Sequence, residues 1–262
     1  MQDLYIITHV YNEKLMLEPW IKHHYDIADK IIILDSNTTD DSLDIVKKYP
    51  KCEIVKSKIP DFSAWGNTQE CMALEASLPA DAFKIILNVT EWIWHPNFKE
   101  FIIKDFNSYN YPIAIGMKSI IMVDTQPEID LCNKSPYGFV DYRQEHRRWR
   151  FVHNAKYGQY EIGRHGTTLP TLLRDDMFIL WLGFFPYPQC KERKLQIQTQ
   201  IPQADKNVRL GWEHIINSEE LDQRHQEFVI KSNNLMFNDD FIRGFNFYSK
   251  ESFPFAKYSE AY

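Results

Sequence analysis

The sequence predicts an α/β fold, in which a mostly parallel sheet is flanked by helices and followed by a smaller C-terminal lobe. The first observation is that short apolar runs alternate with helix-like segments over residues 1–96, a pattern typical of parallel strands joined by right-handed crossovers. The second observation is size. The chain has 262 residues, of which 44% are hydrophobic, and this suffices for one such domain with a full core.

Four buried strands are predicted in the first half, because each run is short, apolar and bounded by polar turn residues. These strands cover residues 4–10, 30–34, 53–56 and 83–88. Helices are predicted between and after the strands, where apolar residues recur at helical spacing, at residues 15–28, 43–49, 68–77 and 98–106.

The alternation is looser in the second half. We expect a strand or a bent pair of strands at residues 113–123 and a long polar loop at residues 124–143. The other expected elements are short strands at 147–153 and 160–162, an apolar and aromatic segment at 171–187, and helices at 191–200 and 218–231.

Charge and cysteine content exclude several classes of protein. The net charge of −6 argues against general binding to nucleic acid, which depends on lysines and arginines that neutralise phosphates. The four cysteines are Cys52, Cys71, Cys132 and Cys190, and no two of them have CxxC spacing. We therefore expect reduced thiols, as in a cytoplasmic protein, and neither a disulfide framework nor a zinc site.

The sequence shows no targeting segment and no membrane span. Its N-terminal residues lack the basic and apolar regions of a signal peptide. No apolar run reaches the roughly 20 residues that a membrane-spanning helix requires. We expect a cytoplasmic protein that associates with membranes only through the molecules it binds, and that can be one module of a longer protein.

Polar residues follow three of the predicted strands at the point where each strand ends. Asn12 and Glu13 follow the first strand, residues 35–41 follow the second, and residues 88–91 follow the fourth. Ligands of parallel α/β sheets bind outside the carboxyl ends of the strands. The three polar groups are therefore predicted to share one binding site.

Several short motifs occur in a fixed order in the first half of the chain. They are Val10-Tyr11-Asn12-Glu13, Trp20-Ile21, His23-His24, the segment from Ile32-Ile33-Leu34-Asp35 to Asp40-Asp41-Ser42, Asn67-Thr68-Gln69, and Asn88-Val89-Thr90-Glu91-Trp92. In this order and spacing they resemble the family 2 type of GT-A glycosyltransferases over residues 3–96. The resemblance implies a Rossmann-like GT-A fold, with a nucleotide-sugar-binding half at residues 1–96 and an acceptor-binding half at residues 97–262.

The resemblance also implies an activity. A sugar would pass from a nucleotide-diphosphate donor to a glycan or lipid-linked acceptor, with inversion at the sugar carbon, in polysaccharide or glycoprotein glycan assembly. Asp35 would accept a hydrogen bond from the base or ribose, beside Asn12 and Glu13. The full set expected at the nucleotide sugar is Val10, Asn12, Glu13, Asp35, Asn37, Gln69, Asn88, Val89, Thr90, Arg148 and Arg150.

Basic residues of the second half supply candidates for binding the diphosphate or an anionic acceptor. Arg148 and Arg150 lie in a cluster with Arg147, and Lys156 and Arg164 are further candidates. Guanidinium groups suit this role because they form paired hydrogen bonds with phosphate oxygens.

The metal-binding motif of the family is altered in this sequence. Family members usually carry two aspartates that hold Mg²⁺ or Mn²⁺ against the diphosphate. Asn88 and Thr90 occupy those positions here, and Glu91 is the carboxylate that remains. Three interpretations stay open: Glu91 and His165 hold Mn²⁺ or Mg²⁺ together with the phosphates; the enzyme works without a metal, with Arg or Lys balancing the charge; or the site is degenerate.

An inverting transferase needs an Asp or Glu beside the acceptor hydroxyl. Asp124 follows the predicted strand at 113–123 and is the expected base, with Glu91 and Glu128 as alternatives. The main alternative function is a degenerate GT-A domain that binds a nucleotide sugar or glycan without turnover. A nucleotidyltransferase would carry a glycine-rich loop after the first strand, and the sequence THVYNEK has no glycine there. Nothing specific favours a non-enzymatic partner-binding domain.

Overall fold

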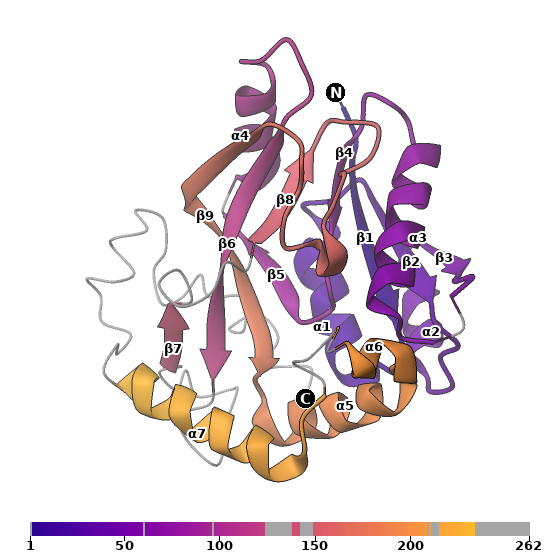
Figure 1. The fold of residues 1–262 in the computed structure, drawn as a ribbon. Coiled ribbons are helices and arrows are strands. Elements are labelled where there is room, and N and C mark those ends of the chain that lie inside the picture. Colours follow the sequence, from indigo (N-terminus) through magenta and orange to yellow (C-terminus); the bar gives the residue numbers. More distant parts are fainter. Residues whose placement is uncertain are drawn as a thin grey trace.

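The computed structural model describes residues 2–59, 61–95, 97–123, 138–141, 149–208, 210 and 215–233. These residues form an α/β fold with a large, mostly parallel mixed sheet flanked by helices (Figure 1). Along the sheet the strand order is β3 (Cys52–Lys56), β2 (Lys30–Asp35), β1 (Leu4–Val10), β4 (Phe83–Ile86), β8 (Trp149–His153), β6 (Ala114–Val123), β9 (Thr171–Phe184) and β5 (Glu91–Trp94), with β7 (Gly138–Asp141) paired to β6.

The first four strands are parallel, so their carboxyl ends lie at one edge of the sheet. In the register of β1 and β2, Val10 lies opposite Asp35. Strands β6 and β9 are also parallel to each other, while β8, β7 and β5 run antiparallel to their neighbours. Figure 1 shows the ends of β6 and β9 pointing toward the C-terminal helices.

Seven α-helices are described, and they cover both faces and one edge of the sheet. They are α1 (Lys14–Tyr25), α2 (Ser42–Val46), α3 (Ala64–Ser77), α4 (Phe98–Phe106), α5 (Tyr187–Gln200), α6 (Gln203–Asn207) and α7 (Ser218–Asn233). Helix α4 shows how the sequence sets the packing. Phe98, Ile102 and Phe106 recur every four residues, so one face of the helix is buried.

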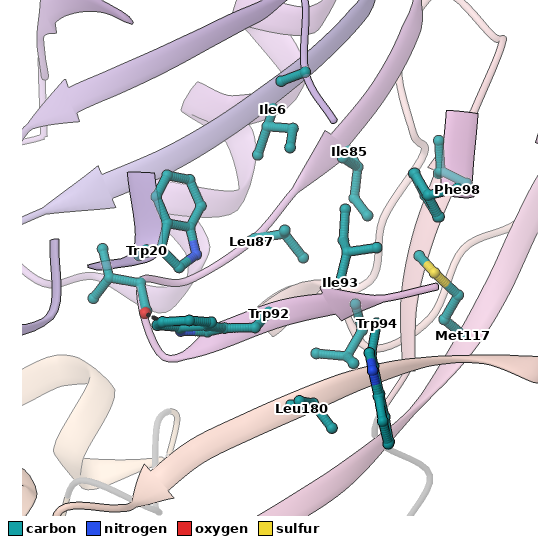
Figure 2. Close-up of a cluster of buried hydrophobic side chains, with 14 of the residues drawn as sticks. Ile6, Trp20, Ile85, Leu87, Trp92, Ile93, Trp94, Phe98, Met117 and Leu180 are labelled. Carbon is teal, nitrogen blue, oxygen red and sulfur yellow. Dashed lines mark hydrogen bonds between the residues drawn. The ribbon is translucent and has the colours of Figure 1, made fainter. Parts of the chain in front are cut away.

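The sheet is apolar on both faces, which is why its parallel strands read as continuous hydrophobic runs. Successive residues of β1 point to opposite sides, so Ile6 joins one buried cluster and Ile7 joins another. The larger cluster contains Trp20 of α1 and Trp92 of β5 (Figure 2). The smaller cluster lies under α3 and contains Cys71.

Helix α1 is tied to β5 by buried hydrogen bonds. The Trp20 indole donates to the Glu91 carbonyl at 2.9 Å. His24 lies between the Trp20 carbonyl, 2.8 Å from Nδ1, and the Ile93 amide, 3.2 Å from Nε2. A carbonyl only accepts and an amide only donates, so His24 is neutral with its proton on Nδ1. These contacts fix the start of β5, where Glu91 lies.

Most predicted elements of the first half are confirmed. The strand at residues 4–10 and the helix at 98–106 have the predicted bounds, and the others differ by a few residues at their ends. The α/β class is confirmed as a mostly parallel mixed sheet. The sheet is continuous across residue 96, because β4 pairs with β8 and β5 pairs with β9.

Three predictions about local structure need correction. Strand β5 was not predicted, and its pairing partner β9 lies far along the chain. Strand β7 lies within residues 124–143, which were predicted as a polar loop. The short strand expected at residues 160–162 is instead an isolated bridge between Tyr160 and Thr167, followed by the short 3₁₀ helix η1 (Ile162–Arg164). Within the described part of the chain, no helix is both long enough and apolar enough to cross a membrane.

Candidate functional site

The loops after β1 and β2 are joined by the side chain of Asn12. Its Oδ1 accepts hydrogen bonds from the backbone amides of Thr39 at 2.8 Å and Asp40 at 3.2 Å. Asn12 itself has a left-handed backbone, with φ of 53°, a conformation that asparagine tolerates better than most residues. Asn37, in the second loop, has φ of 65°. Two of the predicted nucleoside-binding segments are thus held together.

Asp35 lies at the carboxyl end of β2 and is almost buried. Its carboxylate accepts hydrogen bonds from the Thr38 amide and from Lys56 Nζ, both at 2.8 Å. Burial opposes the charged form, but these bonds outweigh it and lower the pKa of Asp35. Val10 lies beside it, and its carbonyl accepts from Ser36 and from the Thr38 hydroxyl.

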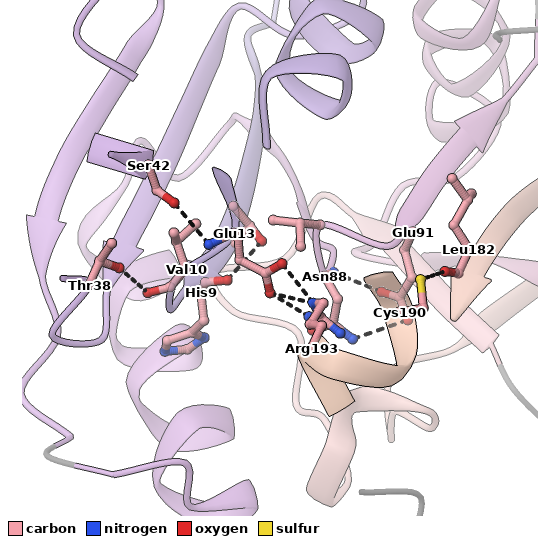
Figure 3. A network of polar contacts seen from close by, with 12 residues as sticks. His9, Val10, Glu13, Thr38, Ser42, Asn88, Glu91, Leu182, Cys190 and Arg193 are labelled. Carbon is pink, nitrogen blue, oxygen red and sulfur yellow. Dashed lines mark hydrogen bonds and ion pairs between the residues drawn. The ribbon is translucent and has the colours of Figure 1, made fainter. Parts of the chain in front are cut away.

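Glu13 is engaged by an arginine of the second half of the chain. Arg193 Nε in α5 lies 2.7 Å from both carboxylate oxygens of Glu13, and Glu13 is 4% exposed. Figure 3 shows Arg193 between Glu13 and Asn88. Burial opposes the charge of Arg193, but Glu13 and more distantly Glu91 favour it, so the pKa of Arg193 is raised. This ion pair fixes α5 against the carboxyl end of β1.

Glu91 is fully buried and, among the described residues, receives hydrogen bonds from Arg150 and Asn88. Arg150 of β8 binds it bidentately, with Nε–Oε2 of 2.7 Å and Nη2–Oε1 of 2.6 Å. Asn88 donates to the same carboxylate from its backbone amide at 2.8 Å and from its side-chain amide at 3.2 Å. Both carboxylate oxygens are thus occupied by donors of the chain.

Asn88 is contacted by a second arginine. Arg164, at the end of η1, donates from Nη2 to the side-chain oxygen of Asn88 at 3.0 Å. Arg150 also holds the η1 turn, because its Nη1 donates to the carbonyls of Gly163 at 3.3 Å and Arg164 at 3.0 Å. The altered metal motif is therefore covered by two guanidinium groups.

His165 contacts Arg150, and this contact defines the tautomer of the His165 ring. Arg150 Nη1 lies 2.7 Å from His165 Nδ1. Because a guanidinium only donates, Nδ1 is the acceptor, and in the neutral imidazole the proton is on Nε2. The nitrogen of His165 that faces Arg150 therefore carries no proton.

These contacts do not fit the predicted divalent cation. Hard cations such as Mg²⁺ and Mn²⁺ need several oxygen ligands with unshared electron pairs. The Asn88 oxygen faces Arg164, the Glu91 oxygens face Arg150 and Asn88, and His165 Nδ1 faces Arg150. Among the residues that the structure describes, no group of three or more His, Cys, Asp or Glu side chains is arranged to hold a metal.

The remaining predicted residues are placed as follows. Gln69 lines a groove with a volume of about 600 Å³ between α3 and strands β2 and β3. Lys56, the partner of Asp35, and the half-exposed Trp65 line the same groove. Val89 and Thr90 are buried beneath the site. Asp124, Glu128, Arg147 and Arg148 lie outside the described residues.

The structure thus brings Asn12, Asp35, Glu13, Asn88 and Glu91 to one edge of the sheet. Arg193 was missing from the predicted site, and its partner Glu13 is 180 positions away in the sequence. No local pattern in α5 marks it. Arg164 is only a further candidate in the sequence, and its left-handed backbone next to Gly163 becomes visible only in the structure.

Comparison with known proteins gives distant structural similarity. No protein-family model matches the chain, and no curated protein matches it. Glucosyl-3-phosphoglycerate synthase from Mycobacterium tuberculosis, solved with Mn²⁺, uridine diphosphate and glucosyl-3-phosphoglycerate, is similar over 46% of this chain and 44% of that one, with 16% identity and a TM-score of 0.34. The match therefore spans less than half the length of that enzyme.

Two other solved structures are similar over longer stretches. Mannose-6-phosphate isomerase from Helicobacter pylori matches 73% of this chain and 78% of its own, with 11% identity and a TM-score of 0.34. Mannose-1-phosphate geranyltransferase from Thermus thermophilus matches 70% and 74%, with 10% identity and the same TM-score of 0.34. Scores at this level do not assign the chain to a family.

Proposed function

We propose that the protein is a glycosyltransferase that binds a nucleotide-diphosphate sugar at the carboxyl ends of β1, β2 and β4. It transfers the sugar to a glycan or lipid-linked acceptor, with inversion. The proposal rests on the residues of this edge and on the sequence motifs that follow the three strands. Residues 1–96 would supply most of the donor site, and the second half would supply the acceptor side.

The observation that carries the proposal is the hydrogen-bonded network at this edge. Asn12 joins the loops after β1 and β2, Glu13 binds Arg193 of α5, and Asn88 binds Arg164 of η1. Polar groups from three strand ends are therefore held beside arginines. An acidic and amide rim next to cationic groups suits a ligand that combines a nucleoside with phosphates.

The nucleoside would lie next to Asp35. Its carboxylate is charged because Lys56 and the Thr38 amide stabilise the anion, and it can accept hydrogen bonds from ribose hydroxyls or a base N–H. The groove lined by Trp65 and Gln69 offers an apolar and aromatic wall for the base. The backbones at Val10 and Asn37 and the segment from Asn88 to Thr90 would complete the donor site.

The acceptor base is proposed to be Asp124, which follows β6. Glu91 suits this role poorly, because a general base needs a lone pair directed at the acceptor hydroxyl. Both oxygens of Glu91 receive hydrogen bonds from Arg150 and Asn88, and the side chain is fully buried. Replacement of Asp124 by Asn should lower kcat much more than it changes donor affinity.

A turnover assay tests the proposed function. Purified protein is incubated with UDP-, GDP- and dTDP-sugars and with glycan or lipid-phosphate acceptors, once with Mn²⁺ and once with EDTA. Release of nucleoside diphosphate that depends on the acceptor supports a transferase. Absence of release under all conditions, despite measurable donor binding, rejects turnover.

A second candidate function is binding of a nucleotide sugar without turnover. The hydrogen bonds that Arg150 donates to both oxygens of Glu91 favour this second function. A carboxylate held in this way stabilises the fold and is not available to react with a ligand. The two candidates separate in the same assay. A binder shows a stable complex with the donor and neither donor hydrolysis nor transfer.

A further inference from the structure

Buried charge at the candidate site is unbalanced in the part of the chain that the structure describes. Arg150 pairs with Glu91, and Arg193 pairs with Glu13. Arg164 lies in the same region, but its partner, Asn88, is neutral. The described contacts therefore place three guanidinium groups against two carboxylates.

Arg164 itself carries the unmatched charge. Its side chain is 8% exposed, and its Nε is buried with no hydrogen-bond partner among the described residues. Arginine stays charged at all physiological pH values. A buried guanidinium without a carboxylate partner is costly in water-free surroundings, and an incoming anion would relieve that cost.

The backbone around Arg164 is held in an unfavourable conformation. Arg164 has φ of 63°, in the left-handed region that side-chain-bearing residues rarely adopt, and Gly163 before it has φ of 81°. The turn is fixed by Arg150 through both carbonyls, and by a hydrogen bond from the Gly163 amide to the Thr68 hydroxyl at 3.2 Å. A strained backbone of this kind persists only where the surrounding contacts impose it. In this conformation the Arg164 side chain reaches Asn88.

We infer that Arg164 forms a binding site for the diphosphate of the donor that takes the place of the divalent cation. The inference rests on the proposed function. It identifies the residue that neutralises the negative charge of the departing nucleoside diphosphate at the donor site. The position where a metal-binding aspartate would stand is Asn88, and a guanidinium already occupies the space in front of its oxygen. Arg164 supplies a fixed positive charge at this point.

Inorganic pyrophosphate is the probe, because it tests the anion site without the nucleoside. Binding to the full chain is measured by calorimetry at constant ionic strength, in EDTA and in Mn²⁺. The wild-type protein should bind in EDTA. Arg164→Gln should weaken binding by about tenfold or more, the scale of one lost charge-assisted contact. Arg164→Lys should lie between the two, because it keeps the charge and loses the planar fork.

Two further variants sharpen the result. Lys104→Gln removes one positive charge from the exposed face of α4, so it is the control for net charge and should leave affinity unchanged. Asn88→Asp places a carboxylate against Arg164. It should lower pyrophosphate affinity in EDTA if Arg164 is the anion ligand, and raise affinity in Mn²⁺ if the site is built for a metal. Thermal melting confirms that each variant is folded. If Arg164→Gln does not fold, the pyrophosphate affinity of Asn88→Asp in EDTA decides whether Arg164 binds the anion.

The outcomes distinguish this inference from the proposed function. Pyrophosphate that binds only with Mn²⁺, or equally well to Arg164→Gln and wild type, overturns the anion site. If nucleotide sugars still bind under those conditions, the proposed function stands. If pyrophosphate binds through Arg164 and no nucleotide sugar binds, the anion site stands and the proposed function fails.

Discussion

Arg150 and Glu91 form a bidentate ion pair with distances of 2.7 and 2.6 Å, and their side chains are 2% and 0% exposed. The pair links β8 to β5, two strands that are not neighbours in the sheet. Arg150 also holds the η1 turn and His165. One arginine therefore connects the altered metal motif to the turn that carries Arg164.

Removal of Arg150 should be strongly destabilising. Arg150→Gln leaves the Glu91 carboxylate buried without its cation, which typically costs about 3–5 kcal/mol. The measurement is urea unfolding at neutral pH. Lys47→Gln is the control, because Lys47 pairs with Asp44 at the surface, where both side chains are more than half exposed and such pairs contribute about 0–1 kcal/mol. Equal losses in the two variants would contradict a structural role for the buried pair.

Glu13 and Arg193 should be energetically coupled. Their contact is the described ion pair between the loop after β1 and helix α5. In a double-mutant cycle with Glu13→Gln and Arg193→Gln, contacting residues typically show a coupling energy of about 0.5–3 kcal/mol. The cycle is measured by chemical unfolding. Strict additivity of the two single changes would show that α5 is docked by other contacts.

Asn12 is predicted to contribute through both its side chain and its backbone. Asn12→Ala removes the acceptor for the Thr39 and Asp40 amides and places alanine at φ of 53°. The expected loss of stability is about 1–3 kcal/mol. Asn12→Gly loses the same hydrogen bonds but adopts this φ without strain, so it should be the milder change. A glycine variant less stable than the alanine variant would contradict the backbone contribution.

Stability should fall below about pH 6.5 in part because of His24. Burial and the neighbouring His23 hold the pKa of His24 well below its usual range. The unfolded chain therefore binds a proton near pH 6.5 that the native protein does not, so stability is lost as pH falls. His9 acts in the opposite direction: burial opposes its protonation, but contacts with Cys71 and Glu70 prevail and raise its pKa.

The contribution of His24 is measured as the difference between two proteins. Wild type and His24→Gln are unfolded in urea at pH 7.5 and 5.5, and glutamine keeps both a donor and an acceptor. The free energy of unfolding of wild type should fall by about 1 kcal/mol more than that of the variant between pH 7.5 and 5.5. This is the free energy that corresponds to a pKa shift of about one unit. An identical pH dependence in both proteins would show that His24 is not the group responsible.

The parts of the fold that could be predicted are those in which local pattern and tertiary contact agree. Residues 4–10 form a run that is apolar on both faces of the sheet, and residues 98–106 place apolar side chains on one helical face. Strand β5 escaped prediction because Glu91–Trp94 is only four residues long and is defined by pairing with β9. Its Trp and Ile residues are equally compatible with a buried loop.

The site was predictable to the extent that it depends on strand ends. Asn12, Asp35 and Asn88 follow parallel strands, so topology alone brings them to one edge. Their partners could not be predicted in the same way. Arg193 reaches Glu13 from α5, and Arg150 of β8 reaches Glu91 at the start of β5, a strand with which β8 does not pair. Such pairs depend on how distant elements pack, which no local spacing encodes.

The central claim is that the carboxyl ends of β1, β2 and β4 bind a nucleotide-diphosphate sugar. The most direct measurement is a thermal-shift titration with UDP-, GDP- and dTDP-sugars, with and without Mn²⁺, on wild type and Asp35→Asn. A ligand that binds only the native state raises the melting temperature. We predict a concentration-dependent rise with one nucleotide class and a weaker rise in Asp35→Asn. No rise with any of these ligands under either condition would contradict the claim.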